Sequence, residues 1–289
     1  MPLSSENFEF IRSFAYSSAA IVLEPGKEYL VDTRLSPLAD QGGFDSLDDF
    51  IHKLRRDRAN TLFHDQVIDA LTTNETSFFR DFHPYEALRH QILPQLIEQR
   101  RTSRRLMIWS AASSTGQEPY SIALLIKEYF PELASWNVSI LGTDLSSTVL
   151  TQAKQGIYSQ LEVNRGLPAP LLIKHFSKTE NNKWAIKDEV KKLVEFRQMN
   201  LNKPWPILPA FDLVFIRNVM IYFDIETKKN ILKRIRNCLL PHGYLFLGSA
   251  ETTVNLDAEY KPVTFNRTVV YESISSSRKG AAAALSTAN

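Results

Sequence analysis

The sequence has a single cysteine, Cys238, among its 289 residues. One cysteine excludes an internal disulfide framework, and the setting R-N-C-L-L-P predicts a buried structural thiol rather than a nucleophile. The sequence also lacks any stretch near the roughly 18 apolar residues of a membrane span. Its N-terminus has no basic segment followed by an apolar one, which a secretory signal would need. We therefore expect an intracellular, cytoplasmic protein.

Glycine is scarce, with 10 residues, and no G-x-G-x-x-G fingerprint occurs. Its absence disfavours a nicotinamide-dependent dehydrogenase. The six histidines show neither H-E-x-x-H nor Cys/His spacing, so we expect no metal site. The balance of 34 basic against 32 acidic residues leaves a net charge of +2, and no basic excess indicates nucleic acid as a partner.

The length and the hydrophobic content of 44% predict a protein with a proper core and two domains. Over roughly the first ninety residues, apolar side chains recur at helical spacing. Helices are predicted to begin near Ser4 and at Ser46, and two more cover Tyr29 to Gln41 and Leu62 to Leu71. We therefore expect an all-α N-terminal region.

The helix predicted from Asp45 to Arg58 carries a basic cluster in its last turns. The cluster consists of Lys53, Arg55, Arg56 and Arg58. Cations suit a helix C-terminus because they offset the helix dipole, so the cluster needs no further role. A docking surface for an acidic partner is the alternative, and both interpretations stay open at this point.

The segment Thr72 to Asp81, T-T-N-E-T-S-F-F-R-D, has no clear period and precedes a helix predicted from Tyr85 to about Gln99. We expect that helix to link two domains. A polar loop with Arg80 at a domain boundary is typical of a ligand lid or a cleft wall. The alternative is a connector anchored in the core by Phe78 or Phe79.

The segment Leu106 to Ala123, L-M-I-W-S-A-A-S-S-T-G-Q-E-P-Y-S-I-A, has the pattern of a strand, a loop and a helix. Small residues fill the loop, so its backbone can approach a ligand at the helix N-terminus. Glu118 places an anion where a phosphate would need a cation or bare N–H groups. An amine or sulfonium ligand therefore fits better than a pyrophosphate. A plain strand-helix corner is the alternative.

From Arg105 onward strands and helices alternate, which predicts a parallel sheet covered on both faces. The strand predicted at Val138 to Gly142 leads to Asp144. Doubly wound folds place a carboxylate for ribose hydroxyls at this point. Asp144 could instead cap the helix predicted from Ser147 to Ala153. Further strands are predicted at Leu193 to Arg197, Phe211 to Ile216 and Tyr244 to Gly248.

Three segments depart from the alternation. Tyr158 to Val190 holds prolines, a polar turn T-E-N-N-K and short alternating runs, and is predicted to form a small antiparallel insert. Val263 to Tyr271 is predicted to be a hairpin that turns at Asn266-Arg267. The tail after Ser273 has low complexity and is expected to be disordered.

Three motifs resemble those of the CheR family of S-adenosylmethionine-dependent chemoreceptor glutamate methyltransferases. They are N-E-T-S-F-F-R at Asn74 to Arg80, S-A-A-S-S-T-G-Q-E-P-Y-S at Ser110 to Ser121, and F-I-R-N-V-M-I-Y-F at Phe215 to Phe223. The resemblance covers Asn7 to Tyr271. It implies an α/β fold, in which an all-α domain precedes a class I, Rossmann-like methyltransferase domain with an antiparallel β-subdomain insert. The expected divisions are 1–83 for the helical domain, 84–104 for the linker helix, 105–273 for the methyltransferase domain with its insert at about 158–192, and 274–289 for the tail.

The resemblance also implies roles for individual residues. Cofactor contacts would fall on Asn74, Thr76, Arg80, Glu118, Asp144, Asn200, Leu201, Asn218 and Val219. Among these, Asp144 would hold the ribose, and Asn200 and Leu201 would flank the adenine. Tyr222 would lie near the methyl group and Arg80 beside the substrate carboxylate, so these two are the expected catalytic residues.

The implied reaction transfers a methyl group from S-adenosylmethionine to glutamate side chains of chemoreceptors, the methyl-accepting chemotaxis proteins. The products would be γ-glutamyl methyl esters, used in sensory adaptation, and S-adenosylhomocysteine. The implied partner is the cytoplasmic helical domain of the receptor, with recruitment to membrane receptor arrays and no membrane insertion. In the family a basic helix of the N-terminal domain is implicated in receptor docking, which favours that role for Lys53, Arg55, Arg56 and Arg58.

Some family members also hold a pentapeptide at the receptor's C-terminus through a glycine-containing loop of the β-subdomain. The corresponding loop here is T-E-N-N-K, without glycine, so we predict no pentapeptide tethering. Methyltransferases that act on the amino groups of DNA typically carry D-P-P-Y or N-P-P-Y after the fourth strand. This chain has R-N-V-M-I-Y, which argues against that rival. A second alternative stays open, in which the chain binds the cofactor and docks on receptors without catalysing methyl transfer.

Overall fold

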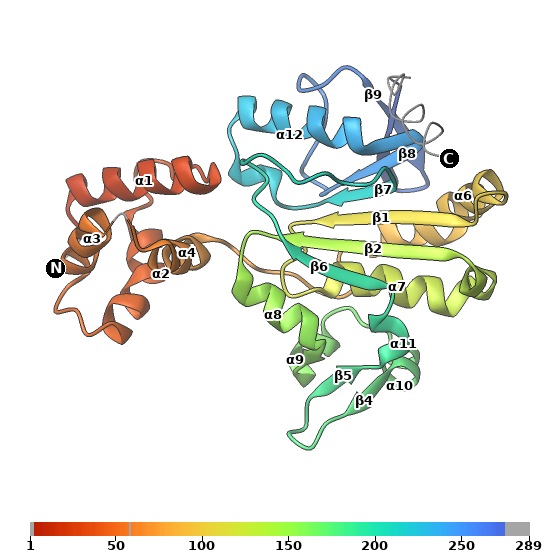
Figure 1. Ribbon diagram of the computed structural model, residues 1–289, viewed down its shortest axis with the longest axis horizontal. Helices are drawn as coiled ribbons and strands as arrows, with labels where there is room; N and C mark the ends of the chain where they lie inside the picture. Colours follow the sequence, from red (N-terminus) through yellow and green to blue (C-terminus); the bar gives the residue numbers. More distant parts are fainter. Residues whose placement is uncertain (1–2, 58, 275–289) are drawn as a thin grey trace, which may run out of the picture.

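The computed structural model describes residues 3–57 and 59–274. A helical N-terminal domain lies beside a larger α/β domain, whose sheet runs through its middle (Figure 1). The predicted order, helices first and alternating strands and helices second, is confirmed. The tail predicted to be disordered, 275–289, and Arg58 lie outside the described residues.

The described residues of the N-terminal domain form four helices. They are α1 Ser5–Ala19, α2 Glu28–Gln41, α3 Leu47–Arg56 and α4 Thr61–Leu71. Ser4 and Ser46 cap α1 and α3, because their side chains accept hydrogen bonds from backbone N–H groups of the first turn. The apolar faces of the four helices meet in a core that is separate from the core of the sheet.

A helical segment from His83 to Arg100 follows the loop after α4. It consists of α5 His83–Ala87, a π-helical turn Leu88–Ile92 and α6 Leu93–Arg100. Leu88, Ile92 and Leu96 are fully buried and belong to the core on one face of the sheet. The linker helix is therefore packed as a part of the larger domain.

The main sheet has seven strands in the order β6-β2-β1-β7-β8-β10-β9. They are β1 Arg105–Ala111, β2 Asn137–Asp144, β6 Val194–Gln198, β7 Phe211–Ile216, β8 Leu239–Leu247, β9 Tyr260–Phe265 and β10 Thr268–Ser273. The strands from β6 to β8 are parallel, and the predicted hairpin β9-β10 extends the sheet antiparallel. Strand β1 has β2 on one side and β7 on the other, so the chain order reverses there. Sheets of this kind bind ligands at the carboxyl ends of the strands beside that reversal.

Helices cover both faces of the sheet (Figure 1). Helix α7 Gln117–Tyr129 and the linker helix pack on one face, and α12 Ile225–Cys238 packs on the other. In β1, Ile108 belongs to the first core and Trp109 to the second, because successive side chains of a strand point to opposite faces. Every residue of β7 is buried, as expected for a parallel strand covered on both sides.

The predicted antiparallel insert lies between α8 Ser147–Gln155 and β6. Its sheet has the order β3-β5-β4. Its elements are β3 Ile157–Tyr158, α9 Gln160–Asn164, α10 Ala169–His175, β4 Phe176–Lys178, β5 Trp184–Ile186 and α11 Asp188–Lys191. The insert shares the core of α7 through Tyr158 and Phe176, so it is fixed to the larger domain.

The turn between β4 and β5 forms without glycine. The backbone N–H of Thr179 donates to the carbonyl of Lys183 at 2.8 Å, and Asn182 adopts φ of +56°. Asparagine tolerates this left-handed conformation better than most residues. The missing glycine therefore does not prevent a tight turn. The absence of pentapeptide tethering stays a prediction.

Candidate active site

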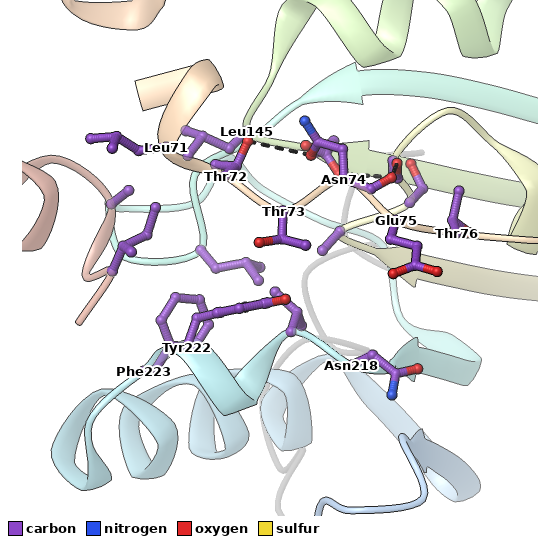
Figure 2. Close-up of a pocket in the computed structure, with 18 of the residues that line it drawn as sticks. Leu71, Thr72, Thr73, Asn74, Glu75, Thr76, Leu145, Asn218, Tyr222 and Phe223 are labelled. Atoms are coloured by element: carbon purple, nitrogen blue, oxygen red, sulfur yellow. Dashed lines mark hydrogen bonds between the residues drawn. The ribbon is translucent and has the colours of Figure 1, made fainter. Parts of the chain in front are cut away.

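A cleft lies at the carboxyl ends of β1, β2 and β7, facing the N-terminal domain. The chain from Leu71 to Thr76 runs along one side, and Tyr222 and Phe223 lie opposite (Figure 2). The space free of atoms, counted out to the open mouth, is ≈ 1270 Å³. Because this figure includes open solvent, the side chains that line the cleft, rather than its volume, indicate what it can bind.

The loop between β1 and α7 approaches the cleft with an unusual backbone. Ala112, Ser114 and Gly116 have φ of +58°, +49° and +94°. A Cβ on Gly116 would lie 3.0 Å from the Cβ of Ala153 and 3.1 Å from the ring of Phe196, so a side chain has no room there. The small residues of this loop thus allow close packing, and they leave its backbone beside the cleft.

Glu118 stands in the first turn of α7, where the helix dipole favours an anion. Its carboxylate accepts a hydrogen bond from the hydroxyl of Ser110 at 2.8 Å and one from Nη1 of Arg217 at 3.0 Å. The side chain keeps 12% of its surface exposed and lines the cleft. The acidic corner inferred from the sequence is therefore partly balanced by Arg217, a residue the sequence reasoning missed although it stands in the third motif.

Asp144 ends β2 and is buried. Its two oxygens accept hydrogen bonds from the backbone N–H groups of Ser114 at 2.8 Å and Ser146 at 3.0 Å. Burial raises the pKa of this carboxyl above its usual value. The alternative role as a helix cap is wrong, because Ser146 caps α8 by accepting from the N–H of Val149.

The segment from Asn74 to Asp81 forms the wall predicted for a ligand site. The carbonyl of Asn74 accepts from the hydroxyl of Ser114 at 2.8 Å, and Nη1 of Arg80 donates to the carbonyl of Glu75 at 3.1 Å. Phe78 is fully buried, with its ring 5.0 Å from that of Tyr158. The segment is thus both a cleft wall and a connector anchored in the core.

The third motif forms the loop after β7. Asn218 has φ of +60°, and the turn Met220–Tyr222 brings Tyr222 to the cleft. Glu251, which sequence reasoning missed, holds this loop. Its carboxylate accepts from the N–H groups of Asn218 and Met220, both at 2.8 Å, and from that of Gly248 at 2.6 Å.

The N-terminal domain also contributes to the cleft, which the sequence gave no signal to predict. Its lining residues include Ala19, Ile21, Val22, Leu23, Leu30, Arg34 and Leu71. The N–H of Val22 donates to the carbonyl of Tyr222 at 3.0 Å. The amide of Asn200 donates to the carbonyl of Ser18 at 2.7 Å, so this side chain is used to fasten the two domains together.

The structure brings the expected cofactor and catalytic residues to this one cleft. They are Asn74, Thr76, Arg80, Glu118, Asp144, Asn200, Leu201, Asn218, Val219 and Tyr222. The described residues of the basic cluster lie elsewhere, on α3 (Figure 1). Lys53 pairs with Asp57 at 3.1 Å and Arg55 with Glu6 at 2.6 Å.

Two family models together match most of this chain. The family model described as CheR methyltransferase, SAM binding domain, matches residues 74–269, and the one described as CheR methyltransferase, all-alpha domain, matches residues 6–72. Chemotaxis protein methyltransferase 1 of Pseudomonas aeruginosa is 41% identical over 275 residues, which cover 94% of this chain and 99% of the relative. Chemotaxis protein methyltransferase Cher2 of Pseudomonas putida is 39% identical with the same coverage. The chemotaxis protein methyltransferase of Vibrio anguillarum is 37% identical over 272 residues, 93% of this chain and 98% of the relative.

These matches confirm the resemblance carried by the three motifs, and with it S-adenosylmethionine as the cofactor. The cleft residues fit such a molecule. Ser113 Oγ and Asn218 Oδ1 are buried at the cleft and have no hydrogen-bond partner among the described residues, so a ligand can supply one. The carboxylates of Glu118 and Asp144 line the cleft and would suit a molecule that carries an ammonium group, a sulfonium and ribose hydroxyls.

Two features are absent from the described residues. Within residues 3–57 and 59–274, there is no group of at least three His, Cys, Asp or Glu side chains that could hold a metal ion. In the same part of the chain, every helix is too short or too polar to span a bilayer.

Proposed function

The chain belongs to the CheR methyltransferase family, and from that premise we propose that it methylates glutamate side chains of chemoreceptors as γ-glutamyl esters. It is an S-adenosylmethionine-dependent chemotaxis protein methyltransferase. The observation that carries the proposal is the meeting of Arg80, Glu118 and Tyr222, from three distant motifs, in one cleft.

The chemistry of the acceptor agrees with the cleft. S-adenosylmethionine supplies a methyl group on a positively charged sulfur. The substrate carboxylate oxygen would attack this methyl group in line, so that the O–C bond of the ester forms as the C–S bond breaks and S-adenosylhomocysteine leaves. A glutamate with a pKa of about 4.3 is already ionised at pH 7, so no general base is needed. No histidine is among the described residues that line the cleft. The chain's contribution is alignment and the exclusion of water, and orientation supplies about 7–11 kcal/mol in favourable cases.

Arg80 would position the substrate carboxylate. One of its nitrogens donates to the carbonyl of Glu75, and the half-buried side chain lines the cleft, so its other N–H groups would donate to a substrate. We propose a single contact rather than a bidentate clamp, because a tight pair would also lower the nucleophilicity of the carboxylate. Tyr222 would orient the reacting groups through its hydroxyl, with its backbone held by Val22.

Receptor docking is proposed for the basic end of α3. Arg55 is already engaged, because it contacts Glu6 at 2.6 Å and Asn7 at 2.9 Å. Arg56 is exposed, and Lys53 is half-exposed in a surface pair that contributes little. The attraction for an acidic receptor surface would therefore come mainly from Arg56 and Lys53.

The decisive experiment is incubation with labelled S-adenosylmethionine and a panel of receptor cytoplasmic domains. We expect label in the receptor that is released as methanol by mild base, since carboxyl esters are base-labile. A matched receptor whose acceptor glutamates are replaced by alanine is the control. Base-stable label would reject glutamate as the acceptor and leave the methyltransferase activity standing.

A further inference from the structure

Arg217 follows β7 directly and connects two functional parts of the cleft. Its side chain is only 2% exposed. Nη1 donates to Oε2 of Glu118 at 3.0 Å, and Nη2 donates to Oδ2 of Asp81 at 2.7 Å and to the backbone carbonyl of Arg80 at 3.0 Å. One buried guanidinium therefore contacts the residue expected at the cofactor's amine and the segment that carries Arg80.

The segment held by Arg217 has a strained backbone. Phe79, Asp81 and Phe82 have φ of +48°, +67° and +51°, a region that bulky L-residues rarely occupy. Such conformations persist only where the surroundings fix them. Two of the fixing contacts come from Arg217, to the side chain of Asp81 and to the carbonyl of Arg80.

The charges of this cluster are not balanced. Two carboxylates, Glu118 and Asp81, share one guanidinium, which leaves a formal charge of one minus two, or −1. An ammonium group beside Glu118 would bring the cluster to zero. Because Arg217 and much of Glu118 are withdrawn from water, such a charge acts on this pair with little screening, whereas Asp81, with 40% of its side chain exposed, is screened more strongly.

We propose that Arg217 is a positioning residue that couples binding of the cofactor's ammonium group at Glu118 to the placement of Arg80. This rests on the proposed function, in which Arg80 positions the substrate carboxylate, and on the further premise that Glu118, which lines the cleft, receives the ammonium group. Coupling between two sites is reciprocal. A change at Asp81, which is absent from the described lining of the cleft, therefore weakens cofactor binding.

The test is calorimetry with two ligands. S-adenosylhomocysteine carries the ammonium group, whereas 5′-methylthioadenosine has the same nucleoside without the amino acid. The variants are Arg217→Gln, Arg217→Lys and Asp81→Asn. Arg100→Gln is the matched control, because Arg100 pairs with Asp212 at 2.6 Å near the opposite end of β7.

We expect Arg217→Gln to weaken binding of S-adenosylhomocysteine by about 10-fold or more, because Glu118 and the Arg80 segment lose the donors that position them. This loss of positioning is expected to outweigh the stronger attraction of a cluster whose formal charge falls from −1 to −2. Binding of 5′-methylthioadenosine should change by less than about 3-fold, since it makes no contact through an ammonium group. Asp81→Asn should also weaken binding of S-adenosylhomocysteine more than binding of 5′-methylthioadenosine. Arg217→Lys should have an intermediate affinity for S-adenosylhomocysteine, because the lysine side chain keeps the charge but lacks the planar fork of arginine. Arg100→Gln should leave the ratio of the two affinities unchanged.

Three outcomes would overturn the coupling. Equal loss for both ligands in Arg217→Gln would reduce Arg217 to a structural role. Unchanged S-adenosylhomocysteine binding in Asp81→Asn would reject the link to the Arg80 segment. If the unmodified protein binds both ligands equally, Glu118 does not receive the ammonium group, and the premise of the coupling fails. Base-labile receptor methylation would still support the reaction in that case.

Discussion

The phenol oxygen of Tyr16, in the helical domain, lies 2.6 Å from Oδ2 of Asp224, the residue that caps α12 in the larger domain. The N–H of Val22 reaches the carbonyl of Tyr222 nearby, at 3.0 Å. These contacts hold the end of α1 against the loop that carries an expected catalytic residue. The cleft is therefore assembled from both domains, and its geometry depends on their docking.

Tyr16→Phe removes the hydroxyl and keeps the ring, so it tests this docking. We expect the affinity for S-adenosylhomocysteine to fall by about 2-fold to 5-fold, the modest effect of a partly exposed hydrogen bond. Calorimetry measures it. Tyr29→Phe is the control, since Tyr29 is an exposed tyrosine of the same domain. Unchanged affinity in Tyr16→Phe would separate domain docking from cofactor binding.

The same contact predicts a pH dependence. The hydrogen bond from Tyr16 lowers the pKa of Asp224, and the Asp224 carboxylate raises the pKa of Tyr16. Asp224 thus stabilises the folded state at a pH above its ordinary pKa of 3.8, and this contribution to the free energy of unfolding is lost as the pH falls through the lowered pKa of the folded state. The contribution of Tyr16 is present below 10.0 and is lost as the pH rises through its raised value. In thermal unfolding, Tyr16→Phe should have a lower melting temperature than the unmodified protein near neutral pH. Below the folded pKa of Asp224 the two melting temperatures should be equal.

Arg80→Ala should lower methyl transfer by at least about 100-fold at saturating cofactor, because misplacement of the carboxylate alone can cost that much. Fold and melting temperature should be unchanged, since the only side-chain hydrogen bond of Arg80 among the described residues is to the carbonyl of Glu75. Transfer is measured with labelled cofactor and a receptor cytoplasmic domain. Arg80→Lys should recover part of the rate. Near-normal transfer by Arg80→Ala would remove Arg80 from the mechanism.

Asp144→Ala should weaken cofactor binding by at least about 10-fold, through the loss of an anionic acceptor for the ribose and of the bond to the loop at Ser114. Ser146→Ala is the control because it removes the cap of α8 and keeps the carboxylate. Calorimetry with S-adenosylhomocysteine compares the two. Equal effects of both substitutions would assign Asp144 a role in folding rather than in ribose binding.

Arg56→Glu should slow receptor methylation at low receptor concentration and leave cofactor binding unchanged. It is a cleaner test than Arg55→Glu, which would also place a second carboxylate beside Glu6. The ratio kcat/KM for the receptor is expected to fall by about 3-fold to 10-fold and to depend on salt. Arg101→Glu, at an exposed position after α6, is a control for net charge. An equal decrease in both variants would argue against docking at α3.

The sequence predicted most elements because their signals are local. Phe211 to Ile216, an uninterrupted apolar run, is a strand with those same bounds. The predicted start of the next strand is wrong. It begins at Leu239 rather than Tyr244, since Pro241 to Gly243, which resemble a turn, form an irregularity within β8 beside a register shift. A bulge of this kind depends on the neighbouring strand, so no local pattern indicates it.

By itself the sequence determined the order of helices and strands, the position of a glycine-poor loop before α7 and the residues that the motifs bring to the cleft. The order of the elements and the position of the loop follow from side-chain periodicity and from conformational preferences within a few residues, whereas the cleft residues follow from the resemblance of the three motifs to the CheR family. Only the tertiary structure decided that Glu118 shares its charge with Arg217, 99 residues away, and that α1 forms part of the cleft. Such pairings depend on how separate elements pack, and pairwise contacts over that distance leave no periodic trace in the chain.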